Sequence, residues 1–152
     1  MDSINKVKSI SIWIFIIPFV AVNTCLILIT TFHDLFPNKQ HVLAEFIFPY
    51  FDGGASISRT ARVFPTYLIF KPAMFLTAYL LIKYWIYNKK IVSSIYGEHK
   101  HIKKFLFFGI ASAICLVLHS IFLGIKYDYD LYKLFRRVVM LMFIIFEIVA
   151  QA

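Results

Sequence analysis

Two arginines and two hydroxyl residues stand within one short segment and have the chemistry of an anion-binding site. They are Ser56, Ser58, Arg59 and Arg62, directly before an apolar run that predicts a helix. Guanidinium groups bind phosphate or carboxylate through paired hydrogen bonds, and the free N–H groups at the start of a helix also attract anions. We expect these residues to bind an anionic headgroup. The alternative is that the two arginines only anchor the helix end at a membrane surface.

Four further polar residues are isolated within long apolar segments: Asn23, Lys71, His119 and Glu147. Counting about 1.5 Å of helix rise per residue from the expected segment ends places the first three at a similar depth, with Glu147 deeper. Charged groups in hydrocarbon normally face the interior of a helix bundle and find partners there. We therefore predict a Lys71–Glu147 ion pair with Asn23 and His119 nearby.

Three of these residues also have other interpretations. The Lys71 amine can extend back to the membrane surface, because side chains on a helix lean toward its N-terminus. Glu147 can be a structural partner of an interior base, or else part of a proton or ion relay. A single histidine within a span, such as His119, more often forms a helix–helix hydrogen bond than binds a metal.

The sequence contains no catalytic motif of the common hydrolase types, because neither H-E-x-x-H nor G-x-S-x-G occurs. His99 and His101 lie among lysines, which favours a solvated basic loop over a metal site. Cys25 and Cys115 fall inside apolar segments, where we expect them to be packing residues. We predict a non-catalytic protein without a cofactor or resident metal. A membrane enzyme of a four-helix class is the less favoured alternative.

The composition determines which kind of element positions these residues. Of the 152 residues, 61% are hydrophobic and 16% are charged, against roughly 45–50% and about 25% in soluble domains. A soluble domain of this size buries only about 70% of its surface, which is too little for this apolar content. The abundance of aromatic and branched residues also excludes a disordered chain. The sequence therefore predicts an integral membrane protein.

Apolar runs that are long enough to cross a bilayer core of about 30 Å define the architecture. We expect one membrane domain over residues 1–152, an all-α polytopic transmembrane helix bundle. Its spans are predicted at about 10–32, 63–87, 105–125 and 134–152. The last apolar stretch is short and ends with the chain, so we expect a truncated fourth span and further spans beyond Ala152.

Basic residues set the expected orientation. The segment from Lys83 to Lys104 holds six lysines against the single acidic residue Glu98. The positive-inside rule places this segment in the cytoplasm, together with Lys6 and Lys8 and hence the N-terminus. This assignment gives eight basic residues inside and seven outside. The outer seven are Lys39, Arg59, Arg62, Lys126, Lys133, Arg136 and Arg137. The net charge of +8 is explained by side chains that face anionic headgroups, without a nucleic-acid partner.

The predicted outer loop at 46–65 carries a recognisable order of residues. Four aromatic residues within 46–51 favour the membrane interface, and Asp52-Gly53-Gly54 predicts a turn. The loop resembles the Frag/DRAM/Sfk family at Pro49, Tyr50, Asp52, Gly54, Ser56 and Pro65. That family includes the damage-regulated autophagy modulators, the GPI-anchor lipid-remodelling proteins and the membrane domain of the Cwh-type remodellers. The resemblance covers the first half of the chain and implies a polytopic protein that handles lipids.

Two functions follow as expectations. The first is a non-catalytic protein that handles or senses lipids through the outer loop 46–65, with membrane lipids as its partners. The alternative is a proton- or ion-coupled transporter that uses Glu147, His119 and Lys71. Either protein is compatible with an oligomer or a partner subunit.

Overall fold

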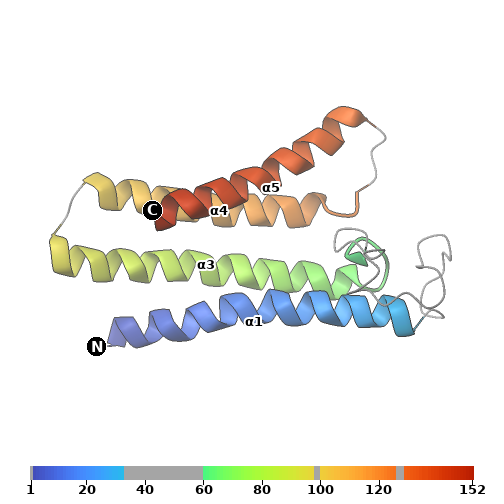
Figure 1. The fold of residues 1–152 in the computed structure, drawn as a ribbon, viewed down its shortest axis with the longest axis horizontal. Helices are drawn as coiled ribbons and strands as arrows, with labels where there is room; N and C mark the ends of the chain where they lie inside the picture. The colour runs from blue at the N-terminus through green and yellow to red at the C-terminus, as the bar shows by residue number, and fades with distance from the viewer. Residues whose placement is uncertain (1, 33–59, 98–99, 126–128) are drawn as a thin grey trace.

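The computed structural model describes residues 2–32, 60–97, 100–125 and 129–152, and within them the chain is helical without a strand. The helices are α1 (Asp2–Thr31), α3 (Tyr67–Tyr96), α4 (Lys100–Phe122) and α5 (Asp130–Gln151). Helix α1 packs on α3, α3 on α4, and α4 on α5. Figure 1 shows that consecutive helices run in opposite directions. The predicted all-α helix bundle is therefore confirmed.

Three of these helices are long and apolar enough to cross a membrane, at Ser3–Thr31, Tyr67–Tyr96 and His101–Phe122. They match the first three predicted spans and fit an integral membrane protein. The fourth predicted span, 134–152, is helical as part of α5, but α5 is not among the helices that qualify. Every 18-residue stretch of α5 contains Arg136, Arg137 and Glu147, so charge rather than length sets it apart. The structure thus supports three spanning helices and one amphipathic helix.

Helix α3 begins at Tyr67 rather than at the predicted residue 63, because the preceding residues form a closed turn. The Thr66 hydroxyl lies 2.6 Å from the carbonyl oxygen of Val63 and is fully buried. The Cys25 thiol of α1 lies 3.5 Å from the Thr66 carbonyl oxygen, which joins this turn to the first helix. At its other end α3 continues to Tyr96, where Gly97 adopts a positive φ of 75° that favours glycine.

The packing between α3 and α4 depends on one close approach. Trp85 of α3 is 2% exposed and lies directly over Gly109 of α4. Its ring contacts Phe105 edge-on with ring centres 4.9 Å apart, and Tyr84 with centres 5.1 Å apart. Lipid tails are as apolar as the side chains of a helix, so the hydrophobic effect does not drive helices together in a membrane. Close contacts between a small residue and a large ring contribute to their association instead.

Replacing Gly109 with alanine should destabilise this packing. A Cβ atom at position 109 would overlap Cγ, Cδ1 and Cδ2 of the Trp85 ring, which its aromatic neighbours hold in place. Overpacking costs about 1–3 kcal/mol, whereas alanine for glycine otherwise favours a helix by about 1 kcal/mol. We expect a lower midpoint of thermal unfolding for the detergent-solubilised Gly109→Ala variant.

The variant Trp85→Phe provides the control, because the smaller ring leaves room for a methyl group. Adding Gly109→Ala to Trp85→Phe should lower the unfolding midpoint less than adding it to the wild type. A midpoint that is unchanged or higher in Gly109→Ala alone would contradict the close approach.

Candidate functional site

A cavity of about 710 Å³ opens between α4, α5 and the turn that precedes α3. Its lining combines four cationic side chains, one histidine and two apolar side chains: Arg62, His119, Lys133, Arg136, Arg137, Met140 and Leu141. We call this cavity the basic pocket. It lies at the end of the bundle where α1 and α4 finish and α3 and α5 begin (Figure 1).

The helical repeat of α5 explains why five of the lining residues share one face. Positions 133, 136, 137, 140 and 141 follow the i, i+3, i+4, i+7, i+8 spacing of a single helix stripe. Arg62 comes from the turn before α3 and His119 from the last turn of α4. Segments that are distant in sequence therefore meet in the basic pocket.

Contacts with the end of α4 hold the first half of α5 beside the pocket. The Tyr132 hydroxyl donates a hydrogen bond to the carbonyl oxygen of Phe122, with an O···O distance of 2.8 Å. The rings of Phe122 and Phe135 also meet edge-on, with centres 5.3 Å apart. Since Phe122 ends α4, these contacts satisfy a terminal carbonyl group and fix where α5 starts.

The basic pocket has a strongly positive lining. Among the lining residues that the structure describes, four are Lys or Arg and none is acidic. The nearby Asp130 accepts a hydrogen bond from Lys133 at 2.9 Å, and both side chains are exposed. This hydrogen bond and the charge of the ammonium group hold the pKa of the Asp130 carboxyl below its usual value. The nitrogens His119 Nδ1 and Arg136 Nε are buried without a hydrogen-bond partner among the described residues.

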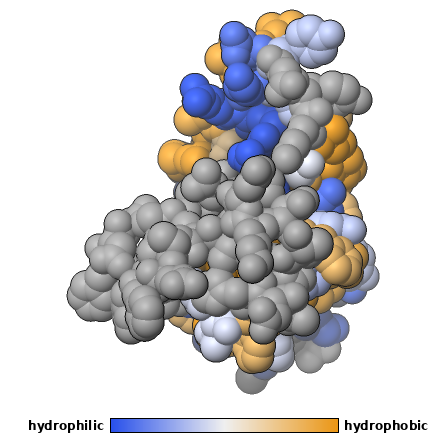
Figure 2. Space-filling view, turned by 90° about the vertical axis from the view of Figure 1, so that its right-hand side faces the viewer, coloured by the Kyte–Doolittle hydropathy of each residue, from blue (hydrophilic) through white to orange (hydrophobic). Residues whose placement is uncertain are grey.

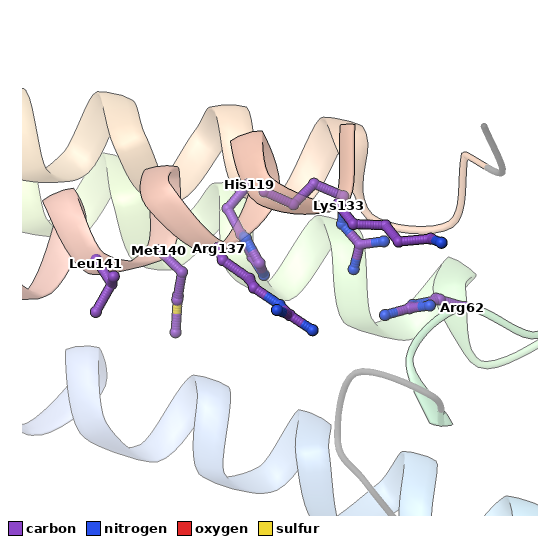
Figure 3. Close-up of a pocket in the computed structure, with 7 residues that line it drawn as sticks. Arg62, His119, Lys133, Arg137, Met140 and Leu141 are labelled. Carbon is purple, nitrogen blue, oxygen red and sulfur yellow. The ribbon is translucent and has the colours of Figure 1, made fainter. Parts of the chain in front are cut away.

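Polarity changes along the pocket in one direction. Figure 3 shows Lys133 and Arg62 at the end nearest the turn, His119 and Arg137 farther in, and Met140 and Leu141 beyond them toward the middle of the bundle. Seen from that end of the bundle, hydrophilic surface gathers on the side where α5 begins (Figure 2). The arrangement can bind an anion at its outer end and an apolar chain at its inner end.

The structure places two of the predicted site residues of the outer loop. Arg62 lines the basic pocket, and Pro65 lies in the turn before α3, after a cis peptide bond from Phe64. The other predicted loop residues lie outside the described part of the chain: Pro49, Tyr50, Asp52, Gly53, Gly54, Ser56, Ser58 and Arg59.

The four polar residues within the apolar segments do not form one cluster. The Lys71 amine lies 3.4 Å from the carbonyl oxygen of Ile121, whereas the Glu147 carboxyl contacts Ser112 at 2.7 Å. Ile121 and Ser112 are nine residues apart on α4, or about 13 Å along its axis. The predicted Lys71–Glu147 ion pair is therefore absent from the structure.

Asn23 and His119 do not join Lys71 or Glu147 either. The Asn23 amide donates to the carbonyl oxygen of Phe19 on its own helix, at 2.7 Å. His119 lines the basic pocket instead of meeting Glu147. Ser112, which contacts Glu147, and His119 are seven residues apart on α4, or about two helical turns, so the structure does not bring the three residues of the predicted relay together.

Sequence reasoning missed the contribution of α5 to the pocket. Lys133, Arg136 and Arg137 entered only as basic residues on the outer side of the membrane. The signal that could have found them is their i, i+3, i+4 spacing, which continues into Met140 and Leu141.

Comparison with known proteins provides no relative from which the role of the basic pocket could be inferred. The chain matches no protein-family model, no curated protein and no solved structure. The class that the fold and site define is an all-α membrane helix bundle with a basic pocket at one end.

Removing the Tyr132 hydroxyl should loosen the start of α5. Tyr132→Phe keeps the ring but loses the hydrogen bond to Phe122, which is worth about 0.5–1.5 kcal/mol. We expect faster amide hydrogen exchange in the first two turns of α5 and a lower unfolding midpoint. Tyr129→Phe is the matched control, because Tyr129 is 75% exposed and should tolerate the change. Equal exchange rates in both variants would argue against this anchor.

Proposed function

We propose that this protein is a non-catalytic lipid-handling or lipid-sensing membrane protein that binds an anionic lipid headgroup in the basic pocket. The observation that carries the proposal is the polarity of the pocket, with cations at the end of the bundle and Met140 and Leu141 toward its middle. A phospholipid in a leaflet has the same order, because its phosphate lies at the surface and its acyl chains extend inward. The pocket therefore suits a lipid better than a free phosphate ion.

The charges of the pocket support a negative ligand. Cations that converge from α5 and the turn before α3 repel one another, and an anion between them removes this repulsion. Three of the lining residues are arginines: Arg62, Arg136 and Arg137. A guanidinium group pairs with phosphate through two parallel hydrogen bonds. The buried Arg136 Nε offers a further hydrogen-bond donor.

The same assignment fits the proposed orientation with a cytoplasmic N-terminus. The basic pocket then faces the outer side, and it accounts for four of the seven basic residues placed there: Arg62, Lys133, Arg136 and Arg137. Their presence on that side reflects ligand binding rather than topology. The resemblance to the Frag/DRAM/Sfk family, with its links to lipid handling, points to the same class of function.

Loss of one pocket arginine should weaken the binding of anionic lipid. Each cation near a lipid phosphate contributes about 1 kcal/mol, so Arg62→Gln and Arg137→Gln should each lower the affinity for phosphatidylglycerol about fivefold. The measurement is native mass spectrometry of lipid adducts in detergent, with phosphatidylcholine of the same acyl chains as the neutral lipid. The two substitutions should also be less than additive, since both residues contact one ligand.

Lys103→Gln and Lys104→Gln are the matched controls, because they remove the same charge from exposed positions on the first turns of α4, at the opposite end of the bundle. Both should bind phosphatidylglycerol like the wild type. A further arm adds inorganic phosphate, which should displace little of the lipid. Equal loss in the lysine and arginine variants would contradict a defined site, and full displacement by phosphate would assign the pocket to a free anion.

Asp130 should oppose lipid binding by occupying Lys133. Asp130→Asn frees the ammonium group and should raise the affinity for phosphatidylglycerol about two- to fivefold, by up to about 1 kcal/mol. In the wild type the same gain should appear on acidification. It should begin only when the pH falls through the lowered pKa of Asp130, since protonation of this carboxyl group then breaks the pair. The gain should vanish in a Lys133→Gln background. Its persistence there would rule out this mechanism.

A further inference from the structure

Two arginines of the basic pocket face each other from different elements. Figure 3 shows the guanidinium group of Arg62, from the turn before α3, pointing toward that of Arg137 on α5. Both residues are exposed, so a ligand in the pocket can reach them. Arg136 is half-buried, and its buried Nε has no hydrogen-bond partner among the described residues. Three guanidinium groups from two elements therefore line one cavity.

Facing guanidinium groups are best matched by a phosphate with three terminal oxygens. A guanidinium group binds phosphate through two parallel hydrogen bonds, each to its own oxygen. A phosphodiester, the form found in phosphatidylglycerol, has only two non-bridging oxygens, so Arg62 and Arg137 would have to share both. A phosphate monoester has three, so each arginine can pair with two oxygens while sharing only one. The facing pair therefore favours a monoester.

The charge of the pocket favours the same form. Lys133 pairs with Asp130, which leaves the three arginines as the main positive charge of the described lining. A phosphodiester carries one negative charge, whereas a phosphate monoester carries about −1.5 to −2 at neutral pH. The monoester therefore offsets more of the repulsion among the arginines than a diester does.

The outer end of the pocket offers little to a larger headgroup. Lys133 and Arg62 lie at that end (Figure 3), and none of the described lining residues is acidic. The nearby carboxylate of Asp130 is already paired with Lys133. The ammonium group of a zwitterionic headgroup would therefore approach cations there, which is unfavourable. A terminal phosphate has no such group beyond it.

We propose that the ligand of the basic pocket is a lipid phosphate monoester, of which phosphatidic acid is the simplest example. Its terminal phosphate lies between Arg62 and Arg137, and an acyl chain extends past Met140 and Leu141 toward the middle of the bundle. This inference rests on the proposed binding of an anionic lipid in the pocket, and it specifies the chemical class of that lipid.

Two lipids that differ by one methyl group test the proposal. Phosphatidylmethanol is phosphatidic acid with a methyl ester on the phosphate, so it lacks one charge and one terminal oxygen but adds little bulk. The measurement is native mass spectrometry of the wild-type protein in detergent at neutral pH, with identical acyl chains in both lipids. Phosphatidic acid should bind about five- to tenfold more tightly, because its second charge meets the arginines. Equal affinities would overturn the proposal.

Arginine variants locate this preference in the pocket. Arg62→Gln and Arg137→Gln should each reduce the ratio of the two affinities, because each removes one of the facing groups. Lys103→Gln is the matched control at the opposite end of the bundle and should keep the wild-type ratio. A ratio that stays unchanged in both arginine variants, or falls equally in Lys103→Gln, would place the preference outside the pocket and refute the assignment. The wild-type comparison stands even if a variant does not fold.

The same measurements distinguish this inference from the proposed function. If the two lipids bind equally and both lose affinity in Arg62→Gln, the pocket accepts anionic lipids of either phosphate class, and only this inference fails. If neither lipid depends on the arginines, both proposals fail. Glycerol 3-phosphate, which has the monoester without acyl chains, should displace little phosphatidic acid. Full displacement would assign the pocket to a soluble phosphate monoester and exclude a lipid as its specific ligand.

Discussion

The absence of water from the bilayer core is the constraint on which this structure depends, because a polar group left without a partner there is costly. The backbone meets it by forming long helices. Polar side chains meet it by donating to carbonyl oxygens one turn earlier, as Asn23 does to Phe19, Thr77 to Ala73 and Ser120 to Leu116. The Lys71 amine reaches the carbonyl oxygen of Ile121 near the end of α4. In this bundle several isolated polar side chains thus hydrogen-bond to backbone carbonyl groups, and a function is not needed to explain their presence.

Helix α5 departs from this pattern. It carries a stripe of cations along its first half and a carboxyl group near its end, so its charges are too many for a helix of the spanning type. Both sets of groups face neighbours: the cations face the basic pocket, and Glu147 faces Ser112 of α4. These charged groups make α5 the element on which the proposed function rests.

The fold was largely predictable, and the places where prediction failed have physical causes. Long apolar runs predict helices because local composition decides whether a segment can cross hydrocarbon. Helix α3 begins at Tyr67 and not at the predicted residue 63, because a hydrogen bond from Thr66 to Val63 closes a turn before it. Hydropathy does not encode such a hydrogen bond. The fourth predicted span is an amphipathic helix and does not qualify as a spanning one, because it contains three charged residues.

The sequence by itself determined that this is a helical membrane protein, that Arg62 belongs to a cationic site and that Glu147 is an exceptional residue. Only the tertiary structure decided which groups meet. Depth along a helix can be counted from the sequence, but the direction in which a side chain points depends on how each helix is rotated and tilted against its neighbours. Lys71 therefore reached Ile121 rather than Glu147, and Arg62 joined cations of α5 that lie more than seventy residues away. Packing of large rings on small residues, such as Trp85 on Gly109, fixes those rotations, and it acts between segments that are distant in the chain.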